Sequence, residues 1–328
     1  MYPKSVEEIF SALPQNSVDF VFEEIKGTNR EAKRKLLKAH KEGEVETKSF
    51  DDADIDLLTF DWVSVDMDRN WWWQVQALPY LGWFAQSYRL FEPKEQAELL
   101  AYCLEVTEQW LRQEEKADQS PLRWHDHATA YRLTSLVHFL VAASTVKQLA
   151  QLVTEKEKRL PFAELITQHV KWLMQDENYS KHTNHGFDQA MAVLSLGLLV
   201  KKKFWFEDVE LAESRLIDEV RFAFTEEGVH KENSPGYHVF MMRRLEKLVR
   251  LEQLGETTVG IEARKIQEGA ERFLEAITLP DGTLPMVGDT RGGQKGKVTE
   301  VDEGPVVYDF SKSGYVIFKG LRNARHQV

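Results

Sequence analysis

Apolar residues recur at intervals of three and four positions along most of the chain, from Asn70 to about Ile277. This spacing is typical of helices that bury one face. The polar segments between them are short, which favours antiparallel helical hairpins. The sequence therefore predicts a mainly α protein. We expect its helices near residues 71–91, 94–114, 127–150, 161–176, 185–201, 208–225, 235–255 and 260–277.

The two ends of the chain differ from this helical stretch. Residues 1–45 predict short helices, and residues 46–70 are irregular and acidic. After Pro280 the sequence LPDGTLPMVGDTRGGQKGKV is rich in glycine and typical of loops. The next segment, SGYVIFKGL, alternates and contains many β-forming residues, which predicts a strand. A lone strand cannot bury its own face, so it either packs against the helices or begins a β domain that continues past Val328. We favour the β domain.

The charge balance restricts the partners of the chain. It carries 53 Asp and Glu against 42 Lys and Arg, a net charge of −11. Such a charge opposes binding to nucleic acid and to anionic membranes, so we expect neither as a partner. An acidic ligand would need a locally basic cleft.

Cysteine content and the chain start bear on cofactors and location. The single cysteine, Cys103, excludes a disulfide framework and a multi-thiolate metal site, and we expect no cofactor or metal within this chain. No run of about 18 apolar residues suggests a transmembrane helix. The amino terminus lacks the basic-then-apolar order of a signal peptide. We therefore expect a cytoplasmic protein, or a periplasmic or secreted one if a leader has been removed.

Three polar clusters stand where helices are expected to begin: RWHDHATAYR (123–132), HTNHGFDQ (182–189) and HKENSPGYHVFMMRR (230–244). Each includes a candidate capping residue. This residue is Asp126 in the first cluster, Thr183 or Asn184 in the second, and Ser234, followed by Pro235, in the third. The clusters are roughly 50 to 60 residues apart, about one helical hairpin. Helices separated by a whole hairpin run in the same direction, so the three amino termini should lie at one end of the bundle.

These clusters concentrate basic side chains. Helix amino termini add N–H groups and partial positive charge, which favour anions. A locally basic surface at this end of the bundle would suit an acidic ligand, although the protein as a whole is acidic. Each residue also has a structural interpretation: Asn184 can be a cap and Tyr237 a core aromatic. The basic side chains of the clusters are His125, His127, Arg132, Lys181, His182, His185, His230, Lys231, His238 and Arg243.

Five segments in this order resemble the heparinase II/III family of polysaccharide lyases and its alginate-lyase-like relatives: RNWWWQVQALPYLGWFAQSY, WHDHATAYRL, NHGFDQAMAVLSLG, ENSPGYH and LPMVGDTR. The resemblance covers most of residues 60–320. It implies an incomplete (α/α) toroid of antiparallel helical hairpins, followed by the first strands of an antiparallel β-sandwich that is truncated here. It also implies three parts: a helical and irregular segment (1–60), the toroid catalytic domain (61–280), and a linker with the start of the sandwich (281–328).

The resemblance implies β-elimination in a glycan that contains uronic acid. This reaction removes the C5 proton beside a carboxylate, and hydrogen bonds to that carboxylate lower the barrier. By similarity, Asn184 and His185 hold the carboxylate, while Tyr237 is the acid and, for some substrates, also the base. Its place in a first helical turn near histidines would stabilise the phenolate. In the family a further histidine comes from the β-sandwich. The implied substrate contacts are Trp124, His125, His127, Arg132, His238, Arg243 and Arg291.

Other functions remain open from the residues alone. His125 and His127 could begin a metal site, although a structural metal in the β domain fits the resemblance better. A glycoside hydrolase would need two carboxylates, with candidates Asp126, Asp188, Glu232 and Asp289. A non-catalytic protein that binds acidic carbohydrate is a third possibility. The expected partner is an acidic polysaccharide or oligosaccharide. The oligomeric state is open. Trp71, Trp72 and Trp73 could stack on sugars, but we expect most of this run in the core.

Overall fold

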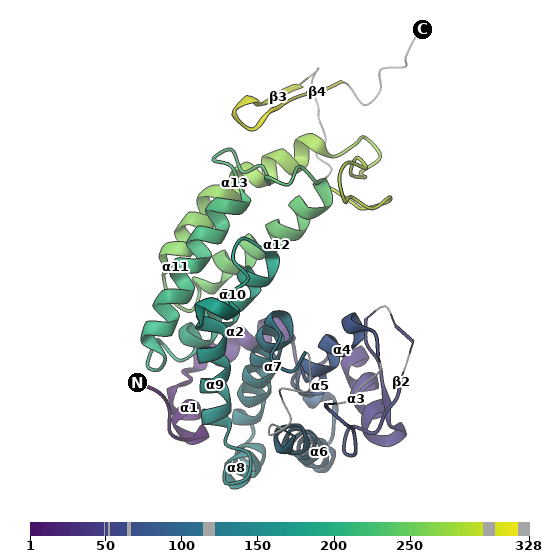
Figure 1. Cartoon of the computed structure of the whole chain (residues 1–328), viewed down its shortest axis with the longest axis vertical. Helices are drawn as coiled ribbons and strands as arrows, with labels where there is room; N and C mark the ends of the chain where they lie inside the picture. Colours follow the sequence, from purple (N-terminus) through teal and green to yellow (C-terminus); the bar gives the residue numbers. More distant parts are fainter. Residues whose placement is uncertain (49, 52, 64–66, 114–121, 298–305, 321–328) are drawn as a thin grey trace. The chain divides into compact units, whose positions relative to one another are not determined.

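The computed structural model describes residues 1–48, 50–51, 53–63, 67–113, 122–297 and 306–320, and within them the chain is mainly α (Figure 1). This confirms the predicted fold class. The helices are α1 (Val6–Ala12), α2 (Gln15–Ile25), α3 (Arg30–Glu42), α4 (Arg69–Gln76), α5 (Pro79–Ser87), α6 (Pro93–Arg112), α7 (Asp126–Ser144), α8 (Lys147–Lys156), α9 (Phe162–Met174), α10 (Asn184–Leu199), α11 (Phe206–Ala223), α12 (Pro235–Leu251) and α13 (Thr258–Ile277). The strands are β1 (Glu44–Val45), β2 (Ala53–Asp54), β3 (Val306–Phe310) and β4 (Tyr315–Lys319), which form two antiparallel pairs.

Contacts divide the chain into two compact units. Unit 1 comprises Met1–Lys181 and His185–Ala212, and unit 2 comprises His182–Asn184 and Glu213–Val328. The three-part division at residues 60 and 280 stays a prediction.

Two of the predicted helices are each two helices in the structure. The segment 71–91 breaks before Pro79, because Leu78 adopts a left-handed conformation (φ 49°) and Pro79 begins α5. The segment 127–150 breaks after α7. There the backbone N–H and the hydroxyl of Thr145 both donate to the carbonyl of Ala142, and the next residue, Val146, is extended.

In unit 1, helix α5 packs against both α3 and α7. Its Phe84 ring lies 5.4 Å from the ring of Phe139 on α7. Burial of each such side chain contributes about 1.5–3 kcal/mol. Trp71 and Trp72 are also buried, with parallel rings 6.0 Å apart. Most of the tryptophan run is therefore core, as expected.

Unit 2 is built on the paired helices α12 and α13. The buried carboxylate of Glu213 on α11 accepts hydrogen bonds from the backbone N–H groups of Thr258 (2.5 Å) and Val259 (3.4 Å) at the start of α13. A negative charge there also interacts favourably with the helix dipole. Glu213 therefore ties α11 to α13.

The predicted strand SGYVIFKGL is β4, but it is not alone. It pairs with β3, with Tyr308 opposite Ile317 and Phe310 opposite Tyr315. One face of this hairpin packs against Phe273 and Ala276 of α13 and against Val229. Its partner β3 was not predicted from the sequence, although β3 has its own alternation of buried and exposed residues. The other face is exposed at Val307, Val316 and Phe318.

A close backbone approach in unit 2 depends on two glycines. Gly228 has φ +79°, and a Cβ added there would lie 2.2 Å from the backbone N of Ala270. A Cβ on Gly269 in α13 would lie 2.5 Å from the carbonyl oxygen of Glu227. The turn before α12 can reach α13 only because both positions lack a side chain.

We predict that Gly269→Ala lowers the free energy of unfolding by about 1–3 kcal/mol, because the clash with backbone outweighs the better helix propensity of alanine. Urea denaturation would measure it. The matched control is Gly82→Ala in α5, where the nearest atom to an added Cβ is 3.7 Å away. That control should gain up to about 1 kcal/mol. Stabilisation by both substitutions would contradict the proposed close approach.

Candidate functional site

Residues from the first two polar clusters meet in unit 1, where Asp126 contacts His185. Helix α7 begins at Asp126 and α10 at Asn184, and the Asp126 carboxylate joins the two starts. Its Oδ2 accepts hydrogen bonds from the Nδ1 of His185 (2.8 Å) and the hydroxyl of Ser180 (2.6 Å). Its Oδ1 accepts from the backbone N–H of His127 (2.6 Å) and lies 3.0 Å from the Nδ1 of His125. The predicted proximity of these two helix starts is confirmed.

Asp126 is ionised in this network. Partial burial by itself opposes ionisation, but the contacts with His125, His185 and Ser180 hold the pKa of the carboxyl well below its usual range. The prediction that Asp126 caps α7 was wrong by one position. His125 is the N-cap residue, and Asp126 is the first residue of the helix.

His185 is the accessible member of the network. Its side chain is 35% exposed, against 14% for His127 and 17% for His125. The rings of His127 and His185 stack with their centroids 3.5 Å apart. Asn184, the residue before it, is partly exposed.

Aromatic side chains border the network. The rings of Trp73 and Tyr131 lie 5.5 Å and 5.7 Å from the ring of His127, and Tyr131 is 44% exposed. Asp188 lies 3.4 Å from the Nε2 of His127. Sequence reasoning missed Ser180 and Tyr131. Tyr131 stands four positions after His127, so helical spacing could have indicated it, whereas nothing in the sequence marks Ser180.

Arg132 is a core residue rather than a substrate contact. Its side chain is fully buried, and its guanidinium donates to the Nε2 of His169 (2.6 Å) and to the carbonyls of Gln76 (2.6 Å) and Arg123 (2.8 Å). Burial, together with this guanidinium, lowers the pKa of His169 well below its ordinary value, so His169 is a neutral acceptor. The predicted surface role of Arg132 is therefore wrong. The partly buried ring of Trp124 lies 5.0 Å from the His169 ring.

We predict that Arg132→Met lowers the free energy of unfolding by about 3–5 kcal/mol, because it leaves buried acceptors without a donor. Chemical denaturation would measure the change. Arg243→Met, at an exposed position of α12, is the control and should shift stability by less than about 0.5 kcal/mol. Unchanged stability with weaker binding of polysaccharide would restore the surface role of Arg132.

The third cluster forms the start of α12 in unit 2. Ser234 is the N-cap residue as predicted, and its hydroxyl accepts from the backbone N–H of Tyr237. The hydroxyl of Thr290 accepts from the backbone N–H of Gly236 (3.0 Å). Pro235 has no N–H group. The expectation of free N–H groups that attract an anion was wrong at this helix, because its donors are already bound.

Two buried histidines flank Tyr237. The Nδ1 of His238 accepts from the backbone N–H of His230 (3.4 Å), and its Nε2 donates to the carbonyl of Ala270 (2.9 Å). Burial lowers the pKa of each histidine to about 4. Both rings are neutral at pH 7, so they lend no positive charge to a Tyr237 phenolate, and that expectation was wrong. His238 is 1% exposed and cannot contact a polymer.

The remaining candidates of unit 2 are at least partly exposed. Tyr237 is partly exposed, and its ring is nearly parallel to that of His230, with centroids 6.4 Å apart. Arg243 and Arg291 are exposed. Asn184, Tyr237, Arg243 and Arg291 belong to unit 2, whereas the network around His185 belongs to unit 1.

The buried pair His230 and His238 predicts loss of stability in acid. The unfolded chain binds protons as the pH falls below about 6.5, whereas the folded protein binds them only near pH 4. Stability is thus fully present above pH 6.5 and falls towards pH 4, by up to roughly 1.4 kcal/mol per pH unit for each histidine. Thermal unfolding of wild type and His238→Asn from pH 7.5 to 4 would test this. The variant should show a shallower slope, and an equal slope would contradict the assignment.

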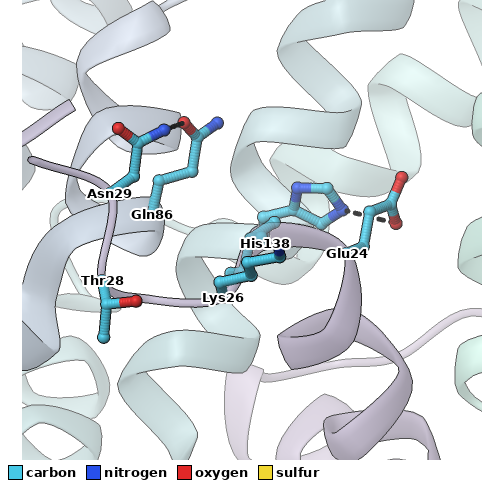
Figure 2. Close-up of a pocket in the computed structure, with 7 residues that line it drawn as sticks. Glu24, Lys26, Thr28, Asn29, Gln86 and His138 are labelled. Atoms are coloured by element: carbon cyan, nitrogen blue, oxygen red, sulfur yellow. Dashed lines mark hydrogen bonds and ion pairs between the residues drawn. The ribbon is translucent and has the colours of Figure 1, made fainter. Parts of the chain in front are cut away.

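A surface hollow elsewhere in unit 1 contains none of the predicted site residues (Figure 2). Its volume is about 480 Å³. The amide of Asn29 donates to that of Gln86 (3.3 Å), and the Nε2 of His138 lies 3.8 Å from a carboxylate oxygen of Glu24. The hollow is lined by Glu24, Ile25, Lys26, Thr28, Asn29, Gln86 and His138.

The described residues show neither a metal-binding cluster nor a membrane-spanning helix. No group of three or more His, Cys, Asp or Glu side chains in this part of the chain is arranged to hold a metal ion. None of the helices described here combines the length and apolar character needed to cross a membrane.

The chain belongs to the heparinase II/III family. The family model described as the heparinase II/III N-terminus matches residues 14–309. No curated protein matches the chain.

Solved structures share its fold at low identity. Heparan sulfate lyase HepC from Pedobacter heparinus superposes with a TM-score of 0.61 and 18% identity, over 80% of this chain and 40% of that one. A structure of heparinase III gives a TM-score of 0.57 and 15% identity, over 77% of this chain and 40% of that one. The shared fold confirms the predicted incomplete (α/α) toroid. The chain spans about 40% of the length of these structures.

Proposed function

We propose that this chain forms part of a polysaccharide lyase that cleaves a uronic-acid-containing glycan by β-elimination. Membership of the heparinase II/III family supports the class of reaction, and the names of the similar structures, a heparan sulfate lyase and a heparinase III, suggest a glycosaminoglycan. The observation that carries the proposal is the accessible His185, held by the partly buried Asp126 and directly preceded by Asn184.

In the proposed reaction, Asn184 and His185 bind the carboxylate of the uronic acid. The negative charge of this carboxylate opposes loss of the neighbouring C5 proton. Hydrogen bonds from the Asn184 amide and, when the ring carries both protons, from the Nε2–H of His185 stabilise the charge that develops on the carboxylate in the transition state. Elimination then breaks the bond between C4 and the leaving oxygen and forms a double bond between C4 and C5.

Tyr237 is the proposed proton donor to the leaving oxygen. A phenol with an unperturbed pKa of about 10 is protonated at neutral pH and suits an acid. The neutral His230 and His238 place no positive charge beside the Tyr237 ring. We therefore assign Tyr237 the acid role and leave the C5 proton to a base outside this chain, which fits the histidine of the family's β-sandwich.

The remaining candidates would bind the polymer. We propose His127 and His125 as contacts beside the carboxylate, with Trp124 at the edge of the same region. The exposed Arg243 and Arg291 would contact acidic groups further along the glycan. These steps require no cofactor from this chain.

Hydrolysis by two carboxylates is less well supported. A glycosidase acid needs a raised pKa so that it is protonated at neutral pH. The pKa of Asp126 is held well below its usual range by its hydrogen-bond partners. Asp126 is therefore unsuited to the acid role.

The test uses the longest natural form of the protein and a panel of uronic-acid polysaccharides. Wild type should release products that absorb in the ultraviolet at the band of unsaturated uronate. Tyr237→Phe should lower kcat by about 10²- to 10⁴-fold, because the leaving oxygen loses its acid. The control, Tyr2→Phe at an exposed tyrosine of unit 1, should keep wild-type activity.

Three results would contradict the lyase assignment or the role of Tyr237. New reducing ends without the unsaturated product would indicate a hydrolase. Binding of a polysaccharide without any product would indicate a non-catalytic protein. Full activity of Tyr237→Phe would remove this residue from the chemistry while leaving the lyase class intact.

A further inference from the structure

We propose that Asp126 is a positioning residue for the lyase reaction, which fixes the ring of His185 so that its Nε2 faces the substrate. This inference rests on the proposed function for its effect on the rate. Its structural part concerns the position of a proton on His185 and can be tested without any activity.

The hydrogen bonds of His185 determine which ring nitrogen is available. Its Nδ1 lies 2.8 Å from Oδ2 of Asp126, and a carboxylate only accepts, so Nδ1 carries the proton of this bond. The Nε2 is then the nitrogen left for a ligand on the accessible side of the ring. Stacking against His127 at 3.5 Å between centroids opposes rotation of the ring.

Asp126 is itself held in place. The Ser180 hydroxyl donates to the same Oδ2 (2.6 Å), and the backbone N–H of His127 donates to Oδ1 (2.6 Å). The carboxylate thus accepts from two directions and cannot rotate without losing bonds. Partial burial strengthens these interactions. Its low pKa supports a permanently ionised acceptor.

Capping of α7 accounts for only one of these contacts, the bond from the backbone N–H of His127 to Oδ1. The other oxygen, Oδ2, binds His185 and Ser180, which lie 54 or more positions away in the sequence. Their separation from Asp126 shows that the carboxylate serves a tertiary contact. Such contacts around a ligand-binding histidine set its tautomer and orientation.

Asp126→Asn provides the test, because asparagine has the same shape but only one acceptor oxygen. Its NH₂ group must face either the N–H of His127 or the His185–Ser180 side. In the second case the Nδ1 of His185 must become an acceptor, which moves the proton to Nε2. Asp218→Asn is the matched control: Asp218 lies 3.1 Å from the Nε2 of His182, in a His–Asp pair outside the proposed machinery.

The first readout is ¹⁵N NMR of the histidine side chains at alkaline pH, with His185→Gln used to assign the signal. Wild type and Asp218→Asn should show neutral His185 as the Nδ1–H tautomer, and Asp126→Asn should shift it towards Nε2–H. A wild-type His185 with its proton on Nε2 would overturn the proposal, whatever the activity.

The second readout is steady-state kinetics. Asp126→Asn should lower kcat by about 10- to 100-fold with KM changed by less than about threefold. A ring whose Nδ1 accepts from asparagine cannot carry both protons, but it still admits substrate. Ser180→Ala should have a smaller effect in the same direction. Full activity of Asp126→Asn would overturn the positioning role. Absence of lyase activity in wild type would instead contradict the proposed function, while NMR would still decide the tautomer.

Discussion

The hydrogen bonds of one partly buried carboxylate determine the geometry at the start of two helices. A charge removed from water is costly unless several donors surround it. Asp126 meets this condition through His185, Ser180 and the backbone of His127. Because these groups come from distant parts of the chain, the ends of α7 and α10 cannot move apart without leaving the charge uncompensated. The proposed carboxylate-binding residues are placed by this constraint.

The cost of burying a charge also determines the state of three other basic residues of the motifs. His230 and His238 avoid the cost by remaining neutral, and Arg132 offsets it with three acceptors. None of them adds positive charge to the surface. Binding of an acidic polymer therefore depends on fewer positive charges than the composition of the clusters suggests. Among the proposed contacts, Arg243 and Arg291 are the exposed cations.

The loop before β3 has a structural part in the start of α12. Thr290, within the sequence GDTR, accepts from the backbone N–H of Gly236, in the sequence SPGYH. A side chain at Gly236 would meet Gln294 of the same loop at 2.6 Å. Two motifs that carry the family resemblance are therefore in contact. The loop fixes the first helical turn, which bears Tyr237, and it presents Arg291 at the surface.

The sequence by itself determined the helical class, most helix positions, the Ser234 cap and the family, because these depend on local periodicity, local hydrogen bonds and ordered motifs. It also predicted that the polar clusters around Asp126 and His185 would meet. It could not decide which members of a cluster face solvent. Arg132 and His238 were predicted as contacts but are buried, and Ser180 joined the network without a signal. Burial and hydrogen-bond partners depend on segments that are distant in the sequence, so only the tertiary structure could fix the charge and exposure of each residue.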